Sequence, residues 1–338
     1  MGVRRDAALP AALVLTGAVS VQSGAGFATR LFGQLPPAAV TALRLWAAAL
    51  ILLLLAGRPT ARAVADLRNR RAWRDAAITV AFGVALGFMN FAIYQAFARI
   101  PLGIAVTIEF LGPLTITVAG AISGSTGTRR AASLSCAALA AAGVVLLANG
   151  ATGHLNGAGV AWAVGAGAAW ACYIIASKTT GQRMPGSTGL VIAMCVAAAA
   201  VTPLGLIEGG THMFRPDLLA AGAGIGLLSS AIPYVLELEA LRRIPASVFG
   251  TWMSMQPAVA ALIGLAILSQ DLSPADWIGI CCVAAASAAA SRRPAGPPAD
   301  PAPGEAGGAG EASEAGGAAA PQTTAVNGAL RCCACFPV

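Results

Sequence analysis

Apolar residues occur along this chain in long runs, and charges, glycine or proline bound each run. A run of about 20 apolar residues is long enough to cross a bilayer as an α-helix. Ten such runs precede Arg292, at residues 8–29, 37–56, 76–97, 101–122, 131–149, 157–177, 188–207, 218–241, 245–268 and 274–291. The pattern predicts an all-α membrane protein with ten transmembrane helices.

The composition supports this prediction. The chain is 57% hydrophobic and 10% charged, and its mean hydropathy is +0.75, whereas a soluble domain is roughly 25% charged. The net charge of +7 is spread over short loops and forms no basic stripe, so we expect no nucleic-acid partner. The lipid bilayer is the expected surrounding.

The pattern changes at Arg292. Residues 292–338 are rich in proline, glycine, alanine and glutamate, a composition that cannot bury a core, and we predict a disordered tail. The tail ends with Cys332, Cys333 and Cys335, whose role the sequence leaves open. A single Cys-x-x-Cys without nearby histidines is a weak signal for a metal site.

Lysine and arginine are unevenly distributed between the two sides of the predicted helices. With a cytoplasmic N-terminus, only Arg30, Arg99 and Arg215 fall in outer loops, and the other loop residues of this kind lie inside. Cytoplasmic loops of membrane proteins are enriched in these residues. We therefore predict a multi-pass protein of the cell membrane with both termini in the cytoplasm.

The two halves of the chain resemble each other. The stretch "RIPLGIAVTIEFLGPLTITVAG" from Arg99 aligns with "RIPASVFGTWMSMQPAVAALIG" from Arg243, and both prolines of each stretch coincide. Proline fixes φ and removes a backbone donor, so shared prolines indicate shared backbone geometry. Because each half has an odd number of spans, we predict inverted repeats over 1–150 and 151–291, an architecture typical of transporters with a site near the membrane midplane.

Glu109 is the only charge in the span from Leu102 to Ile122, about 10 Å inside the hydrocarbon core. A charge there costs roughly 3 kcal/mol, and intramembrane ionisable groups mostly mark pathways. This favours a site that faces a cavity over the alternative, a protonated glutamate bonded between helices. Pro113, four residues later, leaves the Glu109 carbonyl without its helical partner.

Arg44 is the matching cation, at a similar depth in the second span. The alternative for Arg44 is a side chain that snorkels to the interface. The sequence does not separate a direct ion pair between Arg44 and Glu109 from a pair that a substrate bridges.

Neutral polar residues lie inside two other spans. Asn90 and Tyr94 are four residues apart and share a helix face, and Ser20 and Gln22 lie well inside the first span. Such groups hydrogen-bond either to a substrate or to neighbouring helices, and both interpretations stay open.

The eighth span reads "SSAIPYVLELEALRR". Pro233 predicts a kink near Ser229 and Ser230. Glu239 can reach Arg242 or Arg243 at one turn's spacing, which favours an interfacial ion pair. Glu237 has no such partner and is the better candidate for a binding site or a gate.

The sequence does not support an enzyme or a cofactor. The only histidines, His154 and His212, fall in predicted outer loops, away from any nucleophile or metal cluster,. No phosphate-binding Gly-x-x-x-x-Gly-Lys-Ser/Thr motif is present. Transport would therefore be driven by a gradient or by the substrate itself. A non-transporting scaffold or sensor is the alternative from another class, and a monomer and a homodimer are not distinguished.

These stretches resemble the drug/metabolite transporter superfamily, with two EamA-type halves, over residues 8–291. The similarity is greatest to its bacterial inner-membrane threonine/homoserine exporters, and rests on "SVQSGAGFATRLF", "TALRL", "GFMNFAIYQAFARIPLGIAVTIEFLGPL" and "SAIPYVLELEALRRIPASVFGTWMSMQPAVAAL". The resemblance implies ten helices around a central cavity, export of small amino acids and proton antiport, with another metabolite or a cationic drug as alternative cargo.

By position, the resemblance implies functional roles for Glu109, Ser20, Gln22, Arg44 and Glu237. Where relatives commonly have Met-Glu-Pro and Gly-Glu, this chain has Gln256 and Gln270 instead. The ninth span thus lacks a titratable group, which leaves the coupling ion and the stoichiometry open.

Overall fold

A computed structural model describes residues 3–66, 72–123, 127–148, 155–184 and 188–292. The predicted tail lies outside the described residues from residue 293 on. The helices are α1 (Val3–Leu31), α2 (Pro37–Asp66), α3 (Ala72–Phe97), α4 (Leu102–Glu109), α5 (Leu111–Ser123), α6 (Thr128–Ala148), α7 (Gly157–Arg183), α8 (Thr188–Gly209), the 3₁₀ turn η1 (Gly210–Phe214), α9 (Pro216–Gly226), the π turn η2 (Leu227–Ala231), α10 (Ile232–Leu241), α11 (Ala246–Met253), α12 (Gln256–Leu268) and α13 (Pro274–Ser291).

The described residues are helical and contain ten segments long and apolar enough to cross a membrane, which confirms the predicted fold class. Large apolar side chains cover the outer surface, and Leu54 and Ile207 are 77% and 80% exposed. A soluble protein rarely exposes apolar surface on this scale. The outer surface therefore faces lipid.

The fourth and ninth spans are each interrupted near the middle. The fourth span breaks at Phe110, between α4 and α5, and the ninth span breaks at Ser254 and Met255, between α11 and α12. Pro113 and Pro257 follow the breaks, and neither can donate a helical hydrogen bond. As a consequence, Glu109 is the last residue of α4, where the chain changes direction.

The eighth span contains the π turn η2, which ends shortly before Pro233. The turn includes Ser229 and Ser230, so the predicted distortion lies where the sequence places it. Short π turns inside α-helices are frequent at functional sites. Ser20 of α1 donates a hydrogen bond to the Leu228 carbonyl of this turn over 2.7 Å.

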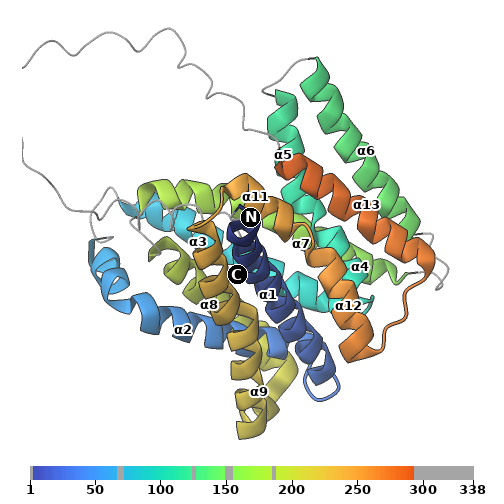
Figure 1. Ribbon diagram of the computed structural model, residues 1–338. Helices are drawn as coiled ribbons and strands as arrows, with labels where there is room; N and C mark the ends of the chain where they lie inside the picture. Colours follow the sequence, from blue (N-terminus) through green and yellow to red (C-terminus); the bar gives the residue numbers. More distant parts are fainter. Residues whose placement is uncertain (1–2, 67–71, 124–126, 149–154, 185–187, 293–338) are drawn as a thin grey trace, which may run out of the picture.

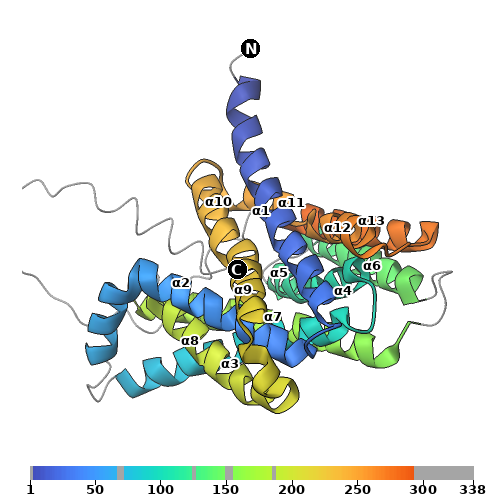
Figure 2. The same ribbon diagram turned by 90° about the horizontal axis from the view of Figure 1, so that it is seen from below.

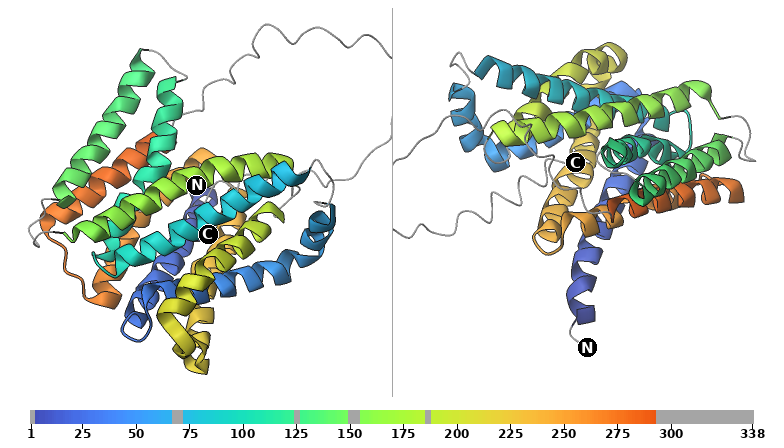
Figure 3. Two further views of the ribbon diagram at one scale, coloured as in Figure 1. Left: turned by 180° about the vertical axis from the view of Figure 1, so that it is seen from behind. Right: turned by 90° about the horizontal axis from the view of Figure 1, so that it is seen from above.

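The helices form two groups that meet around α1, α4 and α7 (Figure 1). In one group, α2 packs on α8, and α3 packs on α7 and α8. In the other, α6 packs on α13, with α5 beside both. The same grouping is visible from behind and from above (Figure 3). Seen from below, α1 projects beyond the other helices at its N-terminal end (Figure 2), and it packs on α10 and α12.

Close contact between α5 and α7 depends on two glycines beside Glu109. A Cβ at Gly112 would lie 2.0 Å from the Gly167 carbonyl oxygen, and a Cβ at Gly167 would lie 2.9 Å from the Glu109 carbonyl oxygen. Small residues let membrane helices approach at backbone distance. This crossing fixes the position of Glu109 relative to α7.

We expect Gly167→Ala to destabilise the protein, because the added methyl group has to push the Glu109 backbone away. Overpacking of this kind costs about 1–3 kcal/mol. Gly165→Ala on the same helix is the control, since its Cβ would meet only Phe88 at 3.8 Å and alanine favours a helix. Thermal unfolding in detergent should show a lower midpoint for Gly167→Ala alone. Equal midpoints for the two variants would contradict the tight crossing.

Candidate functional site

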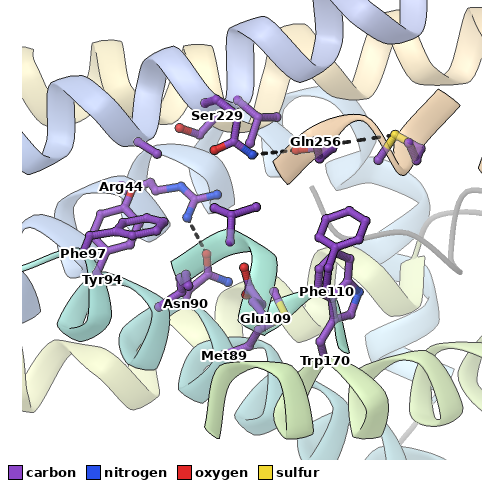
Figure 4. Close-up of a pocket in the computed structure, with 16 residues that line it drawn as sticks. Arg44, Met89, Asn90, Tyr94, Phe97, Glu109, Phe110, Trp170, Ser229 and Gln256 are labelled. Carbon is purple, nitrogen blue, oxygen red and sulfur yellow. Dashed lines mark hydrogen bonds between the residues drawn. The ribbon is translucent and has the colours of Figure 1, made fainter. Parts of the chain in front are cut away.

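A cavity of about 80 Å³ lies where helices of both halves converge. Its lining comes from α1, α2, α3, α4, α7, η2, α11 and α12, and Figure 4 shows its polar side chains turned towards one another. The lining residues are Val21, Gln22, Ala25, Arg44, Met89, Asn90, Ile93, Tyr94, Phe97, Val106, Glu109, Phe110, Trp170, Ser229, Met253 and Gln256.

Arg44 is buried, and its neighbours hold the guanidinium group in one orientation. An Nη1 hydrogen is donated to Asn90 Oδ1, and the Asn90 Nδ2 donates to the Leu86 carbonyl over 2.8 Å. The second bond turns the Asn90 oxygen towards Arg44. The guanidinium carbon lies 5.5 Å from the centre of the Tyr94 ring, within the range of a cation–π contact. Arg44 therefore points into the cavity and does not snorkel.

Glu109 lines the same cavity and is only 9% exposed. Its carboxylate points into the cavity from the end of α4 (Figure 4). Although it lies within electrostatic range of Arg44, the two side chains form none of the ion pairs found among the described residues. A basic and an acidic side chain thus share one small cavity without forming an ion pair.

Several other buried polar atoms of the lining have no hydrogen-bond partner. They are Nε of Arg44, the hydroxyl groups of Tyr94 and Ser229, and Nε1 of Trp170. The Tyr94 hydroxyl lies near Arg44 and Ser229 but without good hydrogen-bond geometry. An unsatisfied buried donor costs about 1–3 kcal/mol. Four such donors around one void can bond the acceptor atoms of a ligand or of water.

Two glutamines close one wall of the cavity. Gln22 on α1 donates from Nε2 to Oε1 of Gln256 on α12 over 2.6 Å, and Gln256 Nε2 lies 3.9 Å from the Met253 sulfur. The amide pair links the first span to the break in the ninth span. It supplies neutral polarity where an acid at position 256 would add a second acidic group beside Glu109.

The remaining candidates lie outside the cavity lining. The Ser20 hydroxyl is occupied by the Leu228 carbonyl, and Glu237 is buried against Gly17 of α1, with its carboxylate oxygen 3.8 Å from where a Gly17 Cβ would lie. Glu239 pairs with Arg243 at 2.5 Å and Arg242 at 3.3 Å, as its spacing predicts. The structure thus gathers Gln22, Arg44, Asn90, Tyr94 and Glu109 and leaves Ser20 and Glu237 apart.

Sequence reasoning did not identify Trp170, Ser229 and Phe110 as lining residues. Trp170 lies in an apolar run, and nothing in that run indicates an unbonded indole N–H. The sequence identifies Ser229 only as a residue near the kink. Helical spacing does not predict which side chains of a π turn point into a cavity. Ser229 could have been identified as a candidate because it is a polar residue beside a predicted helix break.

The described residues therefore form a polytopic α-helical membrane protein. Its cavity is lined by Arg44, Glu109 and buried polar atoms that lack hydrogen-bond partners. Residues 157–292 match the EamA-like transporter family. The chain is 34% identical over 281 residues to the threonine/homoserine exporter RhtA of Escherichia coli K12, covering 82% of this chain and 90% of RhtA, and the match to RhtA of Salmonella typhimurium LT2 has the same extent. The chain belongs to the EamA-like transporter family.

Two further matches are more distant. The uncharacterized transporter YwfM of Bacillus subtilis 168 is 30% identical over 143 residues, which is 42% of this chain and 48% of YwfM. A protein crystal structure with 22% identity superposes with a TM-score of 0.52, covering 82% of this chain and 96% of the other. At that identity the superposition supports the fold alone.

Proposed function

We propose that the protein exports small amino acids of the threonine and homoserine type across the bacterial cytoplasmic membrane. The similarity to RhtA, named a threonine/homoserine exporter, supports the substrate class. The observation that carries the proposal is the cavity, which Arg44 and Glu109 line without pairing. An amino-acid zwitterion needs a cation for its carboxylate and an anion for its ammonium group, and these two side chains offer both.

The neutral lining completes this arrangement. Arg44 Nε, the Tyr94 hydroxyl and the Ser229 hydroxyl are free donors near one another, and a carboxylate accepts several hydrogen bonds. Asn90 holds Arg44, and Gln22 adds an amide to the opposite wall. The carboxylate of the cargo would face Arg44 and its ammonium group would face Glu109.

The size of the cavity favours a small cargo. A water-sized group needs at least about 10–15 Å³ of such space, so the 80 Å³ cavity has room for only a few groups. Sites for drug-sized ligands are about 300–1,000 Å³. A buried arginine also opposes a cationic drug, because like charges repel. Both observations favour an amino acid over the alternative cargo.

For energy coupling we propose proton antiport through Glu109. A carboxylate that binds either the ammonium group of the cargo or a proton exchanges one for the other. Protonation from the outside would weaken the ammonium contact and release the cargo outside. The directions follow from cytoplasmic termini, which the distribution of arginine supports,.

The proposed inverted repeats over 1–150 and 151–291 are supported by reciprocal packing. If each helix is replaced by its equivalent in the other half, the packed pair α3–α7 becomes the pair α10–α1, which is also packed. The packed pairs α2–α8 and α6–α13 each become the same pair again. The breaks at Phe110 and Ser254 also correspond, with the same separation as the aligned prolines. Alternating access in such transporters is a rocking of one repeat against the other around a fixed site.

Export from cells tests the proposed function. In a strain without its own amino-acid exporters, expression of this chain should raise extracellular threonine and homoserine and confer resistance to both. Proteoliposomes with an imposed pH gradient should show the same flux with the purified protein. Flux of a cationic drug or another metabolite without flux of either amino acid would contradict the proposal.

Ser229→Ala separates ligand binding from stability. Among the described residues the Ser229 hydroxyl has no partner with good hydrogen-bond geometry, so its removal should leave the melting temperature unchanged or raise it. Loss of one hydrogen bond to the cargo, about 0.5–1.5 kcal/mol, should weaken threonine binding about 2- to 12-fold. Ser20→Ala is the matched control, because it removes a bond to Leu228 and should lower the melting temperature. A destabilised Ser229→Ala protein with normal affinity would refute this assignment.

A further inference from the structure

A second cavity of about 190 Å³ lies between α5, α7, α11 and α13. Its lining includes Thr117, Ile174, Gly250, Ser254, Ser287 and Ser291. These residues lie in the part of each span nearest to the end of α13. With cytoplasmic termini, the second cavity is on the cytoplasmic side of the central cavity.

Three side chains line both cavities, namely Phe110, Trp170 and Met253. The rings of Phe110 and Trp170 meet edge to face, with their centroids 4.9 Å apart at an interplanar angle of 87°. Figure 4 shows these two rings together at one end of the central cavity. Phe110 occupies the break between α4 and α5, and Met253 ends α11 beside the break in the ninth span. The partition between the cavities is therefore built at both helix breaks.

The second cavity has neutral polar groups in an apolar wall. The Ser254 hydroxyl donates to the Thr251 carbonyl over 2.7 Å, and the Ser291 hydroxyl donates to the Ser287 carbonyl over 2.9 Å. The Ser287 hydroxyl itself is buried and has no partner. None of its lining residues is charged. Such a cavity can admit a small polar solute without holding it tightly.

The walls of the second cavity belong to separate apolar clusters. On one side, α5, α6 and α13 share a cluster that includes Leu114, Cys136 and Ala286. On the other, α1, α10 and α11 share a cluster that includes Val14, Phe249 and Met253. A separation of the two walls would leave each cluster intact and would break only contacts between them, such as those of α11 with α13.

We propose that the second cavity is the cytoplasmic entrance for the amino-acid cargo, and that Phe110, Trp170 and Met253 form the gate between this entrance and the central cavity. The inference rests on the proposed function, because it takes the same cargo. The solute enters as a zwitterion, meets no charged side chain in the second cavity, and passes the gate to reach Arg44 and Glu109. In the present conformation the edge-to-face ring pair closes the passage.

Ser287→Leu tests the entrance without touching the central cavity. The larger side chain fills the passage, so export by proteoliposomes should fall at least about tenfold. Equilibrium binding of labelled threonine in detergent should stay within about twofold of wild type, because alternating access would also open the central cavity to the outside. Ala289→Leu is the control, since Ala289 lies on the same helix with its side chain exposed, and export should be unchanged.

The outcomes separate the entrance from the proposed function. If the wild type neither binds nor exports threonine, the proposed function fails. If the wild type binds and exports threonine and the Ser287→Leu protein exports at the wild-type rate, the proposal that the second cavity is the entrance is wrong. Loss of binding together with export in Ser287→Leu alone would also overturn it.

If the Ser287→Leu protein folds poorly, a smaller substitution at the same position still tests the entrance. Ser287→Cys should export normally until a bulky thiol reagent is added from the cytoplasmic side, and then lose export relative to reagent-treated wild type. Unchanged export after complete labelling of Cys at this position would overturn the entrance.

Discussion

Glu109→Gln is expected to abolish threonine export that an imposed pH gradient drives. The amide has nearly the shape of the carboxyl group, but it neither carries a proton nor bears a charge for the ammonium group. Loss of one charge-assisted hydrogen bond costs about 1.5–3 kcal/mol, which weakens cargo binding about 10- to 150-fold. Loss of proton exchange removes the coupling as well, so the gradient should no longer accelerate export.

The measurement is the initial rate of threonine flux in proteoliposomes with and without the gradient. Glu208→Gln is the control, because Glu208 is exposed near the end of α8 and takes no part in the cavity. It should retain the wild-type rate and the wild-type response to the gradient. A Glu109→Gln protein that exports at the normal rate and still responds to the gradient would contradict the role of Glu109.

Arg44→Ala is expected to have an effect of similar size on binding. It removes the one cation among the described residues that line the central cavity and leaves the carboxylate of the cargo uncompensated. Breaking a buried charge pair by removing one partner costs about 3–5 kcal/mol, so threonine affinity should fall more than about 100-fold. Equilibrium binding of labelled threonine to the purified protein measures this loss.

Arg44→Lys distinguishes charge from geometry. Lysine restores the cation but lacks the planar fork that bonds Asn90 and a carboxylate together,. Its affinity should lie between those of the wild type and Arg44→Ala. Arg99→Ala is the control, because Arg99 bonds Gln95 near the membrane surface, away from the cavity lining. Wild-type affinity in Arg44→Ala would show that the cargo carboxylate binds elsewhere.

The helices and their breaks could be predicted from sequence, because both depend on local chemistry. Apolar runs set the spans, and Pro113 and Pro233 marked distortions that the structure places at Phe110 and in the π turn of residues 227–231. The ends were less certain. The helix α2 continues to Asp66, beyond the predicted end at residue 56, with a non-helical Ala56 between its two parts.

The site could be predicted only in part, because helix rotation is not local. Glu109 and Arg44 were evident, since a charge inside an apolar run is costly wherever it points. Ser20 and Gln22 are both polar and both in the first span, yet Gln22 lines the cavity and Ser20 bonds the π turn. The difference depends on which neighbour each faces. Trp170 and Phe110 could likewise be identified as lining residues only from the three-dimensional arrangement of the helices.

The central claim is that one cavity binds both charged ends of a small amino acid, through Arg44 and Glu109. Competition for threonine counterflow in proteoliposomes tests it most directly, with homoserine, threonine amide and N-acetylthreonine as competitors. Threonine amide lacks the carboxylate and N-acetylthreonine lacks the ammonium group. We predict that homoserine competes about as well as unlabelled threonine and that both blocked compounds compete at least about tenfold more weakly. Equal competition by either blocked compound would contradict the claim, because one of the two charged side chains would then have no role in binding.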